Sequence, residues 1–598
     1  MATLRFLVLA LLTAFSSSAA VFVVTNTADS GPGSLRECIN SANNLAGADD
    51  IEFNLPGSGV RTILLETSLS DITGPVTIDG YTQPGSRANS LEWDNDAQLL
   101  VRLDGLHLTN GLPYALTLKA SGCVVRGLIV VRFPSGIRTD NASNNTIAGN
   151  WIGLDWDGVA RGMAFDGISV YGSSTFNVIG GNSPADRNVV SGNNEGITIF
   201  ATSASNNSVI NNFVGTDARG RLPRGNIFHG VFIQSARNIQ VLRNVLCSST
   251  SGSGLGILGG FGHVIQNNLI GLGAAAWTGL GNSGDGISVN GGSNLIIGGT
   301  NAGNFIGLNG GHGIFLLGGA GSSVTHNRIG IASGGFEPFG NTGSGVCLQG
   351  AGTNRLAYNQ ILFNGDAGVK VYTGSYGTAN EITANQIYDN AGLGIDLGGD
   401  SVTPNDPGDA DVGPNELQNY PELQTATLGG SGLVVAGFLD THPSTTYRLD
   451  FYASDSWDPL WIPEGRAFLG SKVVTTDGLG TASFQFTGSI QAWASDTRIT
   501  ATATDPVGNT SEFSAGVPVV LQPAPPSLLL VRTGSELTVC WSLAASGFNL
   551  EMASSLEPTE SWTPVTTGIL LTTTNFCYTI PDASLAPSQY FRLKKRQD

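Results

Sequence analysis

Charged residues are scarce in this sequence. They make up 12% of 598 residues, with 28 basic side chains against 46 acidic ones. The resulting net charge of −18 argues against nucleic-acid binding, which requires a basic footprint. Cysteine is also sparse, with six residues in the whole chain, and no run after residue 20 is apolar enough to span a bilayer. Cations and neutral sugars are the partners that suit this composition, and no transmembrane segment is expected.

The six cysteines fall into two groups. Four are scattered singly within apolar runs and are expected to be small buried core residues: Cys38, Cys123, Cys247 and Cys347. The other two, Cys540 and Cys577, lie in strand-like runs near the end of the chain. A cross-strand disulfide would join them in an oxidising compartment, and the sequence leaves open whether it forms.

Residues 1–20 have the features of a secretory signal peptide. One positive charge, at Arg5, precedes an apolar run over residues 6–15, and a stretch of small residues ends at Ala20. Cleavage is expected before Val21, because the apolar run is too short for a stable membrane anchor. The mature chain is therefore expected to be secreted or held at the cell surface.

The most informative feature that is present is a repeat of one variable residue, a glycine and an aliphatic residue. Its successive glycines are 23 to 34 residues apart, and Asn-rich spacers lie between the copies. The repeated glycines are Gly136, Gly167, Gly196, Gly230, Gly256, Gly286, Gly313, Gly345, Gly368 and Gly394. Such a period indicates one supersecondary unit stacked about ten times or more.

Within each copy the apolar residues alternate, as in Ile168 and Val170 or Ile197 and Ile199. This period of two predicts strands with one face turned inward. Because the units are too short for crossover helices, each strand is expected to pair with its copy one turn further on, which makes a parallel β-helix. Stacked asparagines are expected to form amide ladders, and loops are expected near residues 155–165, 217–226 and 333–341.

Different patterns flank the repeats, so the predicted fold is all-β with an N-terminal cap and two small β-sandwich domains. Ser34 and Glu37 form a capping box, which predicts a short helix that Gly47 ends. The expected parts are the cap and first coils over residues 21–113, repeats over 114–420, an antiparallel sandwich over 421–520, a Pro-rich linker over 521–527 and a small all-β module over 528–598.

Several segments resemble the secreted bacterial right-handed parallel β-helix repeat proteins, which share the pectate-lyase-like fold. They are residues 24–36 (VTNTADSGPGSLR), residues 78–85 (IDGYTQPG) and the Asn/Gly coils, and residues 503–513 (ATDPVGNTSEF) are similar to the Ig-like module that often follows such helices. The resemblance implies fold and secretion. It carries no catalytic signature, because the wider fold includes lyases, hydrolases, epimerases, sugar-binding proteins and adhesins.

The variable residue before each repeated glycine is expected to form a column on the outside of the stack. Ionisable residues gather in the middle of this column: Asp166, Glu195, His229, Asp285 and His312. Where two carboxylates are neighbours, the charge of one raises the pKa of the other, so that one stays ionised and the other keeps its proton. Hydrolysis of a glycosidic bond uses such a pair as base and acid. The alternative is that these are solvated side chains in a polar surface slot.

A lyase would need other groups, and Lys370 and Tyr372 are the local candidates for its base. The sequence places no obvious acidic cluster beside Lys370, which argues against this chemistry. The Gly-His312-Gly motif is like one in polygalacturonases, but the paired Asp and Arg-x-Lys elements expected around it are missing. Aromatic residues that would stack on sugar rings if exposed are Trp151, Trp156, Phe228, Phe232 and Phe315; alternation turns Phe232 and Phe315 outward.

An acidic stretch follows the last repeat, threaded with Pro and Gly. Its aspartates are Asp396, Asp400, Asp406, Asp409 and Asp411. This density of oxygen atoms suits Ca²⁺, although the spacing is not that of an EF-hand. A structural calcium site between helix and sandwich and a solvated linker are the two interpretations.

Two functions compete on the sequence alone. The first is an extracellular polysaccharide-binding protein, which acts on the glycan as a hydrolase or lyase or only binds it. The second is a non-catalytic surface or adhesion protein that uses the coils as a rigid spacer.

Overall fold

The computed structural model describes residues 19–108, 114–274, 278–332, 337–372, 377–430, 432–454, 464–490, 496–522, 526–556, 562–581 and 588–596. Most of the predicted signal peptide, residues 333–336 of a predicted loop and residues 523–525 of the predicted linker lie outside these ranges. The described chain forms two compact units, residues up to 426 with 434–519, and residues 520–598 with 427–433. No helix in the described ranges is long and apolar enough to cross a membrane.

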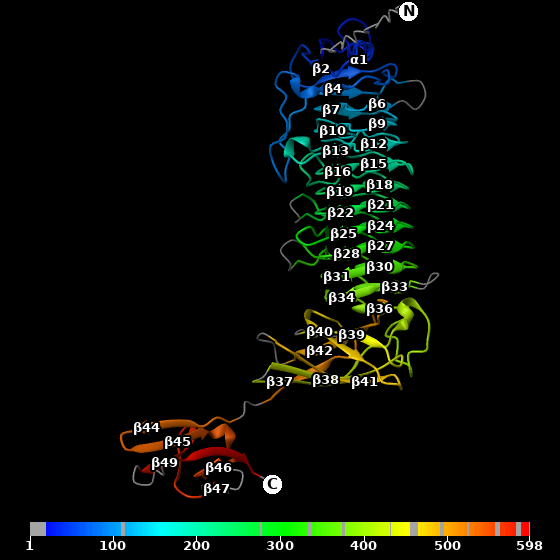
Figure 1. Cartoon of the computed structure of the whole chain (residues 1–598). Coiled ribbons are helices and arrows are strands. Elements are labelled where there is room, and N and C mark those ends of the chain that lie inside the picture. The colour runs from blue at the N-terminus through cyan, green and yellow to red at the C-terminus, as the bar shows by residue number, and fades with distance from the viewer. Residues whose placement is uncertain are drawn as a thin grey trace, which may run out of the picture. The chain divides into compact units, whose positions relative to one another are not determined.

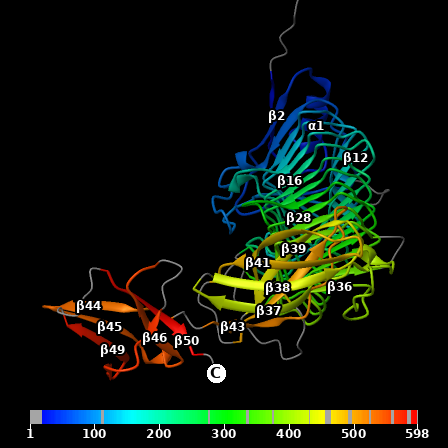
Figure 2. The same cartoon turned by 60° about the horizontal axis from the view of Figure 1, so that its bottom comes forward.

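The first unit begins as a parallel β-helix, which confirms the predicted architecture (Figure 1). Three parallel sheets form its walls. A 13-stranded sheet extends from β1 (Val21–Val24) to β34 (Glu381–Thr383), and a 12-stranded sheet extends from β3 (Arg61–Leu64) to β35 (Gln386–Tyr388). The third sheet has 11 strands, and each strand pairs in parallel with its copy one coil further along the chain (Figure 2).

The 11-stranded sheet carries the repeated glycine phrases. Its strands are β6 (Tyr114–Leu118), β9 (Ser135–Asp140), β12 (Asp166–Tyr171), β15 (Glu195–Phe200), β18 (Val231–Gln234), β21 (Leu255–Leu258), β24 (Ile287–Asn290), β27 (Ile314–Leu317), β30 (Val346–Gln349), β33 (Val369–Tyr372) and β36 (Ile395–Leu397). Ile168 pairs with Ile197, and both are fully buried in the bore.

The register of one coil differs from the sequence prediction. Leu255 pairs with Val231 on one side and Ile287 on the other, and it is fully buried. The repeated glycine of this coil is therefore Gly254 and not Gly256, and Ser253 takes the column position that was assigned to Leu255. A shift of two residues keeps every side chain on its own face, so alternation alone does not distinguish the two registers.

Asparagine ladders line the corners of the coil, as predicted. The longest described ladder lies between the 13- and 12-stranded sheets and contains Asn150, Asn188, Asn212, Asn244, Asn268, Asn304, Asn327, Asn359 and Asn385. In most steps the backbone N–H of one asparagine donates to the side-chain oxygen of the next, and the side-chain amide often donates to the same atom. These bonds satisfy polar groups that the turn would otherwise leave unpaired in the interior.

Removal of one ladder side chain is expected to destabilise the helix. The side chain of Asn244 accepts from the backbone and side-chain amides of Asn212 and donates to the Val209 carbonyl. Asn244→Ala leaves these buried groups unpaired, and we expect a loss of about 2–4 kcal/mol in the free energy of unfolding. Urea unfolding followed by circular dichroism measures the loss. The exposed Asn54 provides the control, and equal midpoints for Asn244→Ala and Asn54→Ala would contradict the role given to the ladder.

The N-terminal end of the stack carries the one α-helix of the described residues, α1 (Leu35–Asn44), as the capping box predicts. Ser34 Oγ accepts from the Glu37 amide, whereas the Glu37 carboxylate bonds to the Gly33 amide. The predicted apolar face is buried and packs against β1 and β2 (Asp49–Phe53): it consists of Leu35, Cys38, Ile39 and Ala42. The helix thus covers the first coil.

Loops outside the 12-stranded sheet form a second apolar layer. Isolated bridges close small hairpins at Leu154 with Ala160, Thr216 with Pro223, Leu272 with Gly279 and Ile331 with Pro338. Three of these lie where loops were predicted. The hairpin at Leu272 was not predicted, because the coil that contains it was counted from Gly256 instead of Gly254 and so was two residues too short. Loop side chains such as Leu154 and Leu272 cover the outward residues Val189, Phe213 and Val245 of the sheet.

The repeat region ends on a mostly antiparallel β domain of seven strands. In sheet order they are β40 (Ala467–Thr475), β39 (Thr446–Ser454), β42 (Arg498–Thr504), β43 (Val517–Leu521), β37 (Glu422–Gly429), β38 (Gly432–Asp440) and β41 (Thr481–Gly488). Phe451 of β39 stacks on Phe486 of β41, so strands far apart in this order share one core. Tyr452 and Phe513 belong to the same apolar cluster as the bore of the helix. The Ig-like identity of this domain stays a prediction.

The last coil is tied to this domain by Glu512. Its carboxylate accepts the backbone N–H groups of Leu397 and Thr403 at 2.9 and 3.0 Å, and the side chain is almost fully buried. Burial, together with the charges of Asp396 and Asp400, raises the pKa of Glu512 to about 7, against the two backbone hydrogen bonds. Ionisation of Glu512 as the pH rises through 7 therefore opposes folding.

The C-terminal residues form their own core around Val539, Trp541, Leu550 and Ile580. One sheet has the order β44 (Leu529–Thr533), β45 (Glu536–Ser542), β49 (Asn575–Pro581) and β48 (Ile569–Leu571). Another has the order β47 (Thr563–Pro564), β46 (Phe548–Ala553) and β50 (Tyr590–Lys595). Cys540 of β45 and Cys577 of β49 are opposite each other and disulfide-bonded. The four other cysteines are free and buried, as predicted.

Candidate functional site

The outward face of the 11-stranded sheet holds the candidate site. Asp166, at the start of β12, pairs directly with Glu195, at the start of β15. His229, Asp285 and His312 occupy the equivalent place before β18, β24 and β27, which pair through β21 in an unbroken row. The structure thus brings all five predicted catalytic residues into one column, two of them on adjacent rungs about 4.8 Å apart.

Asp166 and Glu195 are half-buried carboxylates in an unusual electrostatic setting. Burial raises the pKa of Asp166, against the hydrogen bond that Thr198 Oγ1 donates at 2.9 Å and the positive charge of Arg138. Burial, together with the Asp166 charge, raises the pKa of Glu195 to about 7, against the hydrogen bond that the His229 amide donates. Near neutral pH, Glu195 is therefore partly protonated, which suits the acid of an acid–base pair.

An aromatic and cationic group lies further along the same strands, toward their other ends. Tyr171 and Phe200, at the far ends of β12 and β15, stack with ring centroids 5.5 Å apart, and each ring is more than a third exposed. The Arg138 guanidinium lies 4.2 Å from the Tyr171 centroid and bonds to the Tyr114 hydroxyl. Proteins hold a sugar ring with stacked aromatic rings, and its hydroxyl groups with planar cations and carboxylates.

Side chains of the column also have a structural role. Glu195 Oε2 accepts the His229 amide at 2.8 Å, and Asp285 Oδ1 accepts the His312 amide at the same distance. His229 Nδ1 accepts the Ser253 amide, and His312 Nδ1 accepts the Ser344 amide. Each of these side chains thus satisfies a backbone N–H on the next coil.

The two histidines are neutral hydrogen-bond donors. Because Nδ1 accepts from a backbone amide, the ring proton is on Nε2. Burial lowers the pKa of both His229 and His312, which maintains this form at neutral pH. Phe232 and Phe315 lie at outward positions, half-buried, with ring centroids 5.1 and 5.5 Å from these imidazoles. They support the histidines and present only part of each ring to a ligand.

Lys370 has acidic neighbours that the sequence analysis did not find. Its Nζ lies 3.0 Å from Asp366 and 3.4 Å from Asp396, and 5.1 Å from the Tyr372 centroid. Burial opposes its charge, but the bond to Asp366 and the two negative charges raise the pKa of Lys370. A lysine held protonated in this way is a poor base for a lyase.

The five predicted calcium ligands do not lie together. Asp396 binds Lys370, and Asp400 is exposed. Side-chain oxygens of Asp406, Asp409 and Asp411 lie within 4.8 Å of one another. Asp409 already accepts from Gln418, Asn419 and Thr441, whereas Asp411 Oδ1 is buried without a hydrogen-bond partner. The calcium site stays a prediction, now confined to these three aspartates.

Sequence reasoning missed Arg138, Tyr171 and Phe200. The column was traced only at the residue before each glycine, although the outward positions three and five residues further on are equally repeated. Alternation from the buried residues Ile168 and Val170 places Tyr171 outward and would have found this group. The predicted aromatic surface is divided between two walls, because Trp151 is on the 12-stranded sheet whereas Phe232 and Phe315 are on the 11-stranded sheet.

The geometry agrees with the one family model that matches. A model described as "Right handed beta helix region" matches residues 277–406. With the three parallel sheets, this match makes the chain a right-handed parallel β-helix protein.

Solved structures with a similar fold include a bacteriophage tailspike, an epimerase and an adhesin. The Dettilon tailspike protein is 14% identical over 80% of this chain and 91% of that one, with a TM-score of 0.40. The A-module of the Azotobacter vinelandii mannuronan C-5 epimerase AlgE6 is 16% identical over 64% of this chain and all of that one, with a TM-score of 0.38. PfbA, a surface adhesin of Streptococcus pneumoniae, is 12% identical over 62% and 92%, with a TM-score of 0.39. These are likenesses of fold.

Proposed function

We propose that the protein binds an extracellular polysaccharide along the 11-stranded sheet and cleaves a glycosidic bond with Glu195 and Asp166. The observation that carries the proposal is that this pair begins the same two strands, β12 and β15, that end in the exposed Tyr171–Phe200 stack. Glu195 donates its proton to the leaving oxygen, and Asp166 acts on the opposite side as the ionised partner. The rung spacing of about 4.8 Å is close to the carboxyl separation of retaining glycosidases, about 5–5.5 Å.

A screen of plant, algal and microbial polysaccharides tests the proposal. The full chain is incubated with each polymer, and products are assayed for new reducing ends and for unsaturated uronates. Reducing ends without unsaturation are expected, because hydrolysis leaves no double bond. Unsaturated products would show a lyase instead, and the protonated Lys370 argues against that outcome.

Binding is expected to depend on the aromatic stack. Tyr171→Ala and Phe200→Ala each remove a stacking surface, and we expect each to lower affinity for the polysaccharide found in the screen about tenfold. Affinity electrophoresis measures the change. Tyr358→Ala is the matched control, because this exposed tyrosine lies outside the sheet that carries the site. Unchanged affinity in all three variants would show that the polysaccharide binds at another surface.

A second candidate function is a non-catalytic binding or adhesion protein, and one observation favours it. Glu195, Asp285, His229 and His312 each accept a backbone amide from the next coil, a role that needs no chemistry. Glycan binding without any release of reducing ends would support this function.

A further inference from the structure

A cavity of about 580 Å³ lies on a different wall of the helix from the candidate site. It opens at the 12-stranded sheet, between the chain around Val60 and Thr62, the segment around Gln98 and Leu99, and the indoles of Trp151 and Trp156. Its volume is within the range of about 300–1,000 Å³ that is usual for small-ligand sites. None of the residues that line it belongs to the 11-stranded sheet.

The lining of this cavity is aromatic and polar but uncharged. Trp151 and Trp156 provide two indoles, and Val60 and Leu99 add aliphatic surface. Polar groups come from Gln98, which is exposed, and from Thr62. No lining residue carries a charge. A ligand with apolar C–H faces and neutral hydroxyl groups fits this wall, because the neighbouring cations Arg61 and Arg102 already bond to protein groups.

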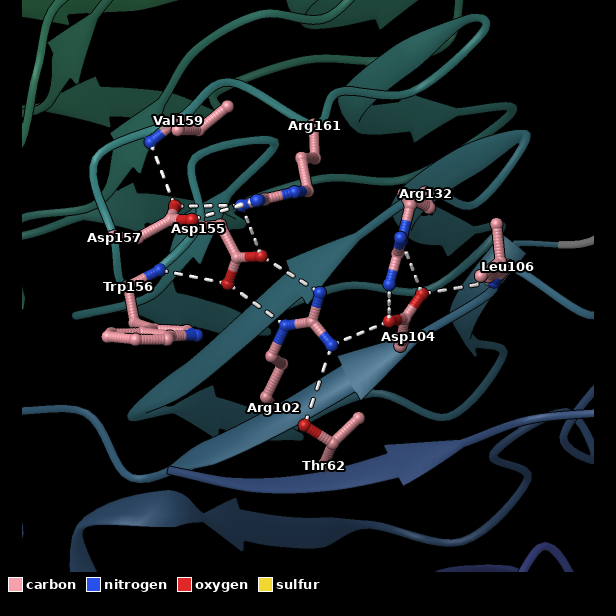
Figure 3. Close-up of polar contacts among 10 residues, drawn as sticks. All are labelled: Thr62, Arg102, Asp104, Leu106, Arg132, Asp155, Trp156, Asp157, Val159 and Arg161. Atoms are coloured by element: carbon pink, nitrogen blue, oxygen red, sulfur yellow. Dashed lines mark hydrogen bonds and ion pairs between the residues drawn. The ribbon is translucent and has the colours of Figure 1, made fainter. Parts of the chain in front are cut away.

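Trp156 is held in place by a buried ion-pair network (Figure 3). Arg102 lies between Asp104 and Asp155 and forms two bonds to the Asp155 carboxylate, at 2.9 and 2.8 Å. Arg161 bonds to the same carboxylate at 2.7 Å, and Asp155 Oδ1 accepts the Trp156 amide at 2.9 Å. Arg102, Asp104 and Asp155 are all at least nine-tenths buried.

The indole of Trp156 itself lies in solvent. The Trp156 residue is 59% exposed, although its backbone is anchored to a buried salt bridge. A ligand that covers this exposed indole removes a large apolar surface from water, and the anchored backbone reduces the ordering that binding requires. Arg102 also directs a bond to the Thr62 hydroxyl oxygen at 3.5 Å, which leaves the hydroxyl hydrogen free to donate.

We infer that this cavity is a binding site for one or two sugar units of a neutral polysaccharide. Trp156 stacks on the face of a pyranose ring, Trp151 closes the inner side, and Gln98 and Thr62 bond to its hydroxyl groups. The site is independent of Asp166 and Glu195, so a chain held here need not be the one cleaved on the other wall.

Isothermal titration with neutral hexasaccharides tests the inference. The panel is cellohexaose, mannohexaose, xylohexaose and laminarihexaose, with hexagalacturonate as the charged comparison. The Tyr171→Ala/Phe200→Ala double variant of the full chain is used as the background, so that binding at the 11-stranded sheet does not contribute. At least one neutral hexasaccharide is expected to bind, and more tightly than hexagalacturonate.

The indole variants then locate the site. Trp156→Ala is expected to lower the affinity about tenfold or more, and Trp156→Phe to retain most of it. Phe261→Ala, at an exposed aromatic outside the cavity, is expected to change nothing. The inference is overturned if no neutral hexasaccharide binds, if hexagalacturonate binds best, or if Trp156→Ala binds as tightly as its background. None of these results bears on cleavage by the unmodified chain.

Discussion

Glu195→Gln is expected to lower the rate of glycan cleavage about a hundredfold or more without unfolding the coil. The side-chain oxygen of glutamine can still accept the His229 amide, so the bond between coils is retained. The proton that Glu195 donates to the leaving oxygen is lost, and general-acid catalysis of this kind contributes about 10²–10⁴ in rate. Release of reducing ends measures the change, and circular dichroism verifies the fold.

The dependence of the cleavage rate on pH tests the role of Glu195 independently. Glu195 must be protonated to act as the acid, and its pKa is raised to about 7. The rate should therefore fall as the pH rises through about 7. On the acid side it should fall as Asp166 becomes protonated, at a pH above the usual range of an aspartate because its pKa is also raised.

The stability of the protein should follow Glu195 in the same direction. A carboxyl whose folded pKa is raised stabilises the fold fully below its unfolded pKa, and this contribution is lost as the pH rises through the folded value. Glu195→Gln should remove both the alkaline fall in activity and this part of the loss in stability.

The matched control is Glu422→Gln, a change at an exposed glutamate of β37 (Glu422–Gly429). It should leave the cleavage rate and its pH profile unchanged. If Glu195→Gln cleaves at the rate of the unmodified chain, Glu195 is not the acid. The role of Glu195 would then be limited to the hydrogen bond that it accepts from the His229 amide, as expected for a non-catalytic adhesion protein.

Arg102→Leu is expected to lower the free energy of unfolding by about 3–5 kcal/mol. Arg102 is shared by Asp104 and Asp155, and both carboxylates are 1% exposed. Removal of the cation leaves two buried negative charges with only the flanking Arg132 and Arg161 to compensate them. The loss is large because the partners cannot regain solvent without opening the fold.

Urea unfolding, followed by circular dichroism, measures this loss. Arg221→Leu is the matched control, because its ion pair with Asp94 is 2.7 Å long, between the 2.6 and 2.8 Å of the Arg102 pairs, but half of the Arg221 side chain is exposed. The control should change stability by less than about 1 kcal/mol, as is usual for solvent-exposed pairs. Equal losses in the two variants would show that burial does not decide the strength of this network.

The candidate site was only partly predictable. The sequence identified Asp166 and Glu195 because a fixed period places equivalent residues on adjacent rungs. It missed the contact between Lys370 and Asp366, since Asp366 lies one residue before the position that repeats. It also grouped Trp156 with Phe232, although the cavity lined by Trp156 and the strand of Phe232 lie on different walls. A period gives the order of residues along a wall but not which wall a loop covers.

The repeat in the chain is enough to specify the coil, because alternating aliphatic residues at a constant period have one way to bury a common face, and asparagines at the corners satisfy the turns. The register at Ser253, the neighbours of each charge and the exposure of each ring follow only from the folded arrangement. These depend on how far side chains reach across rungs and on which loops cover a sheet. Neither quantity is periodic, so no repeat in the chain encodes it.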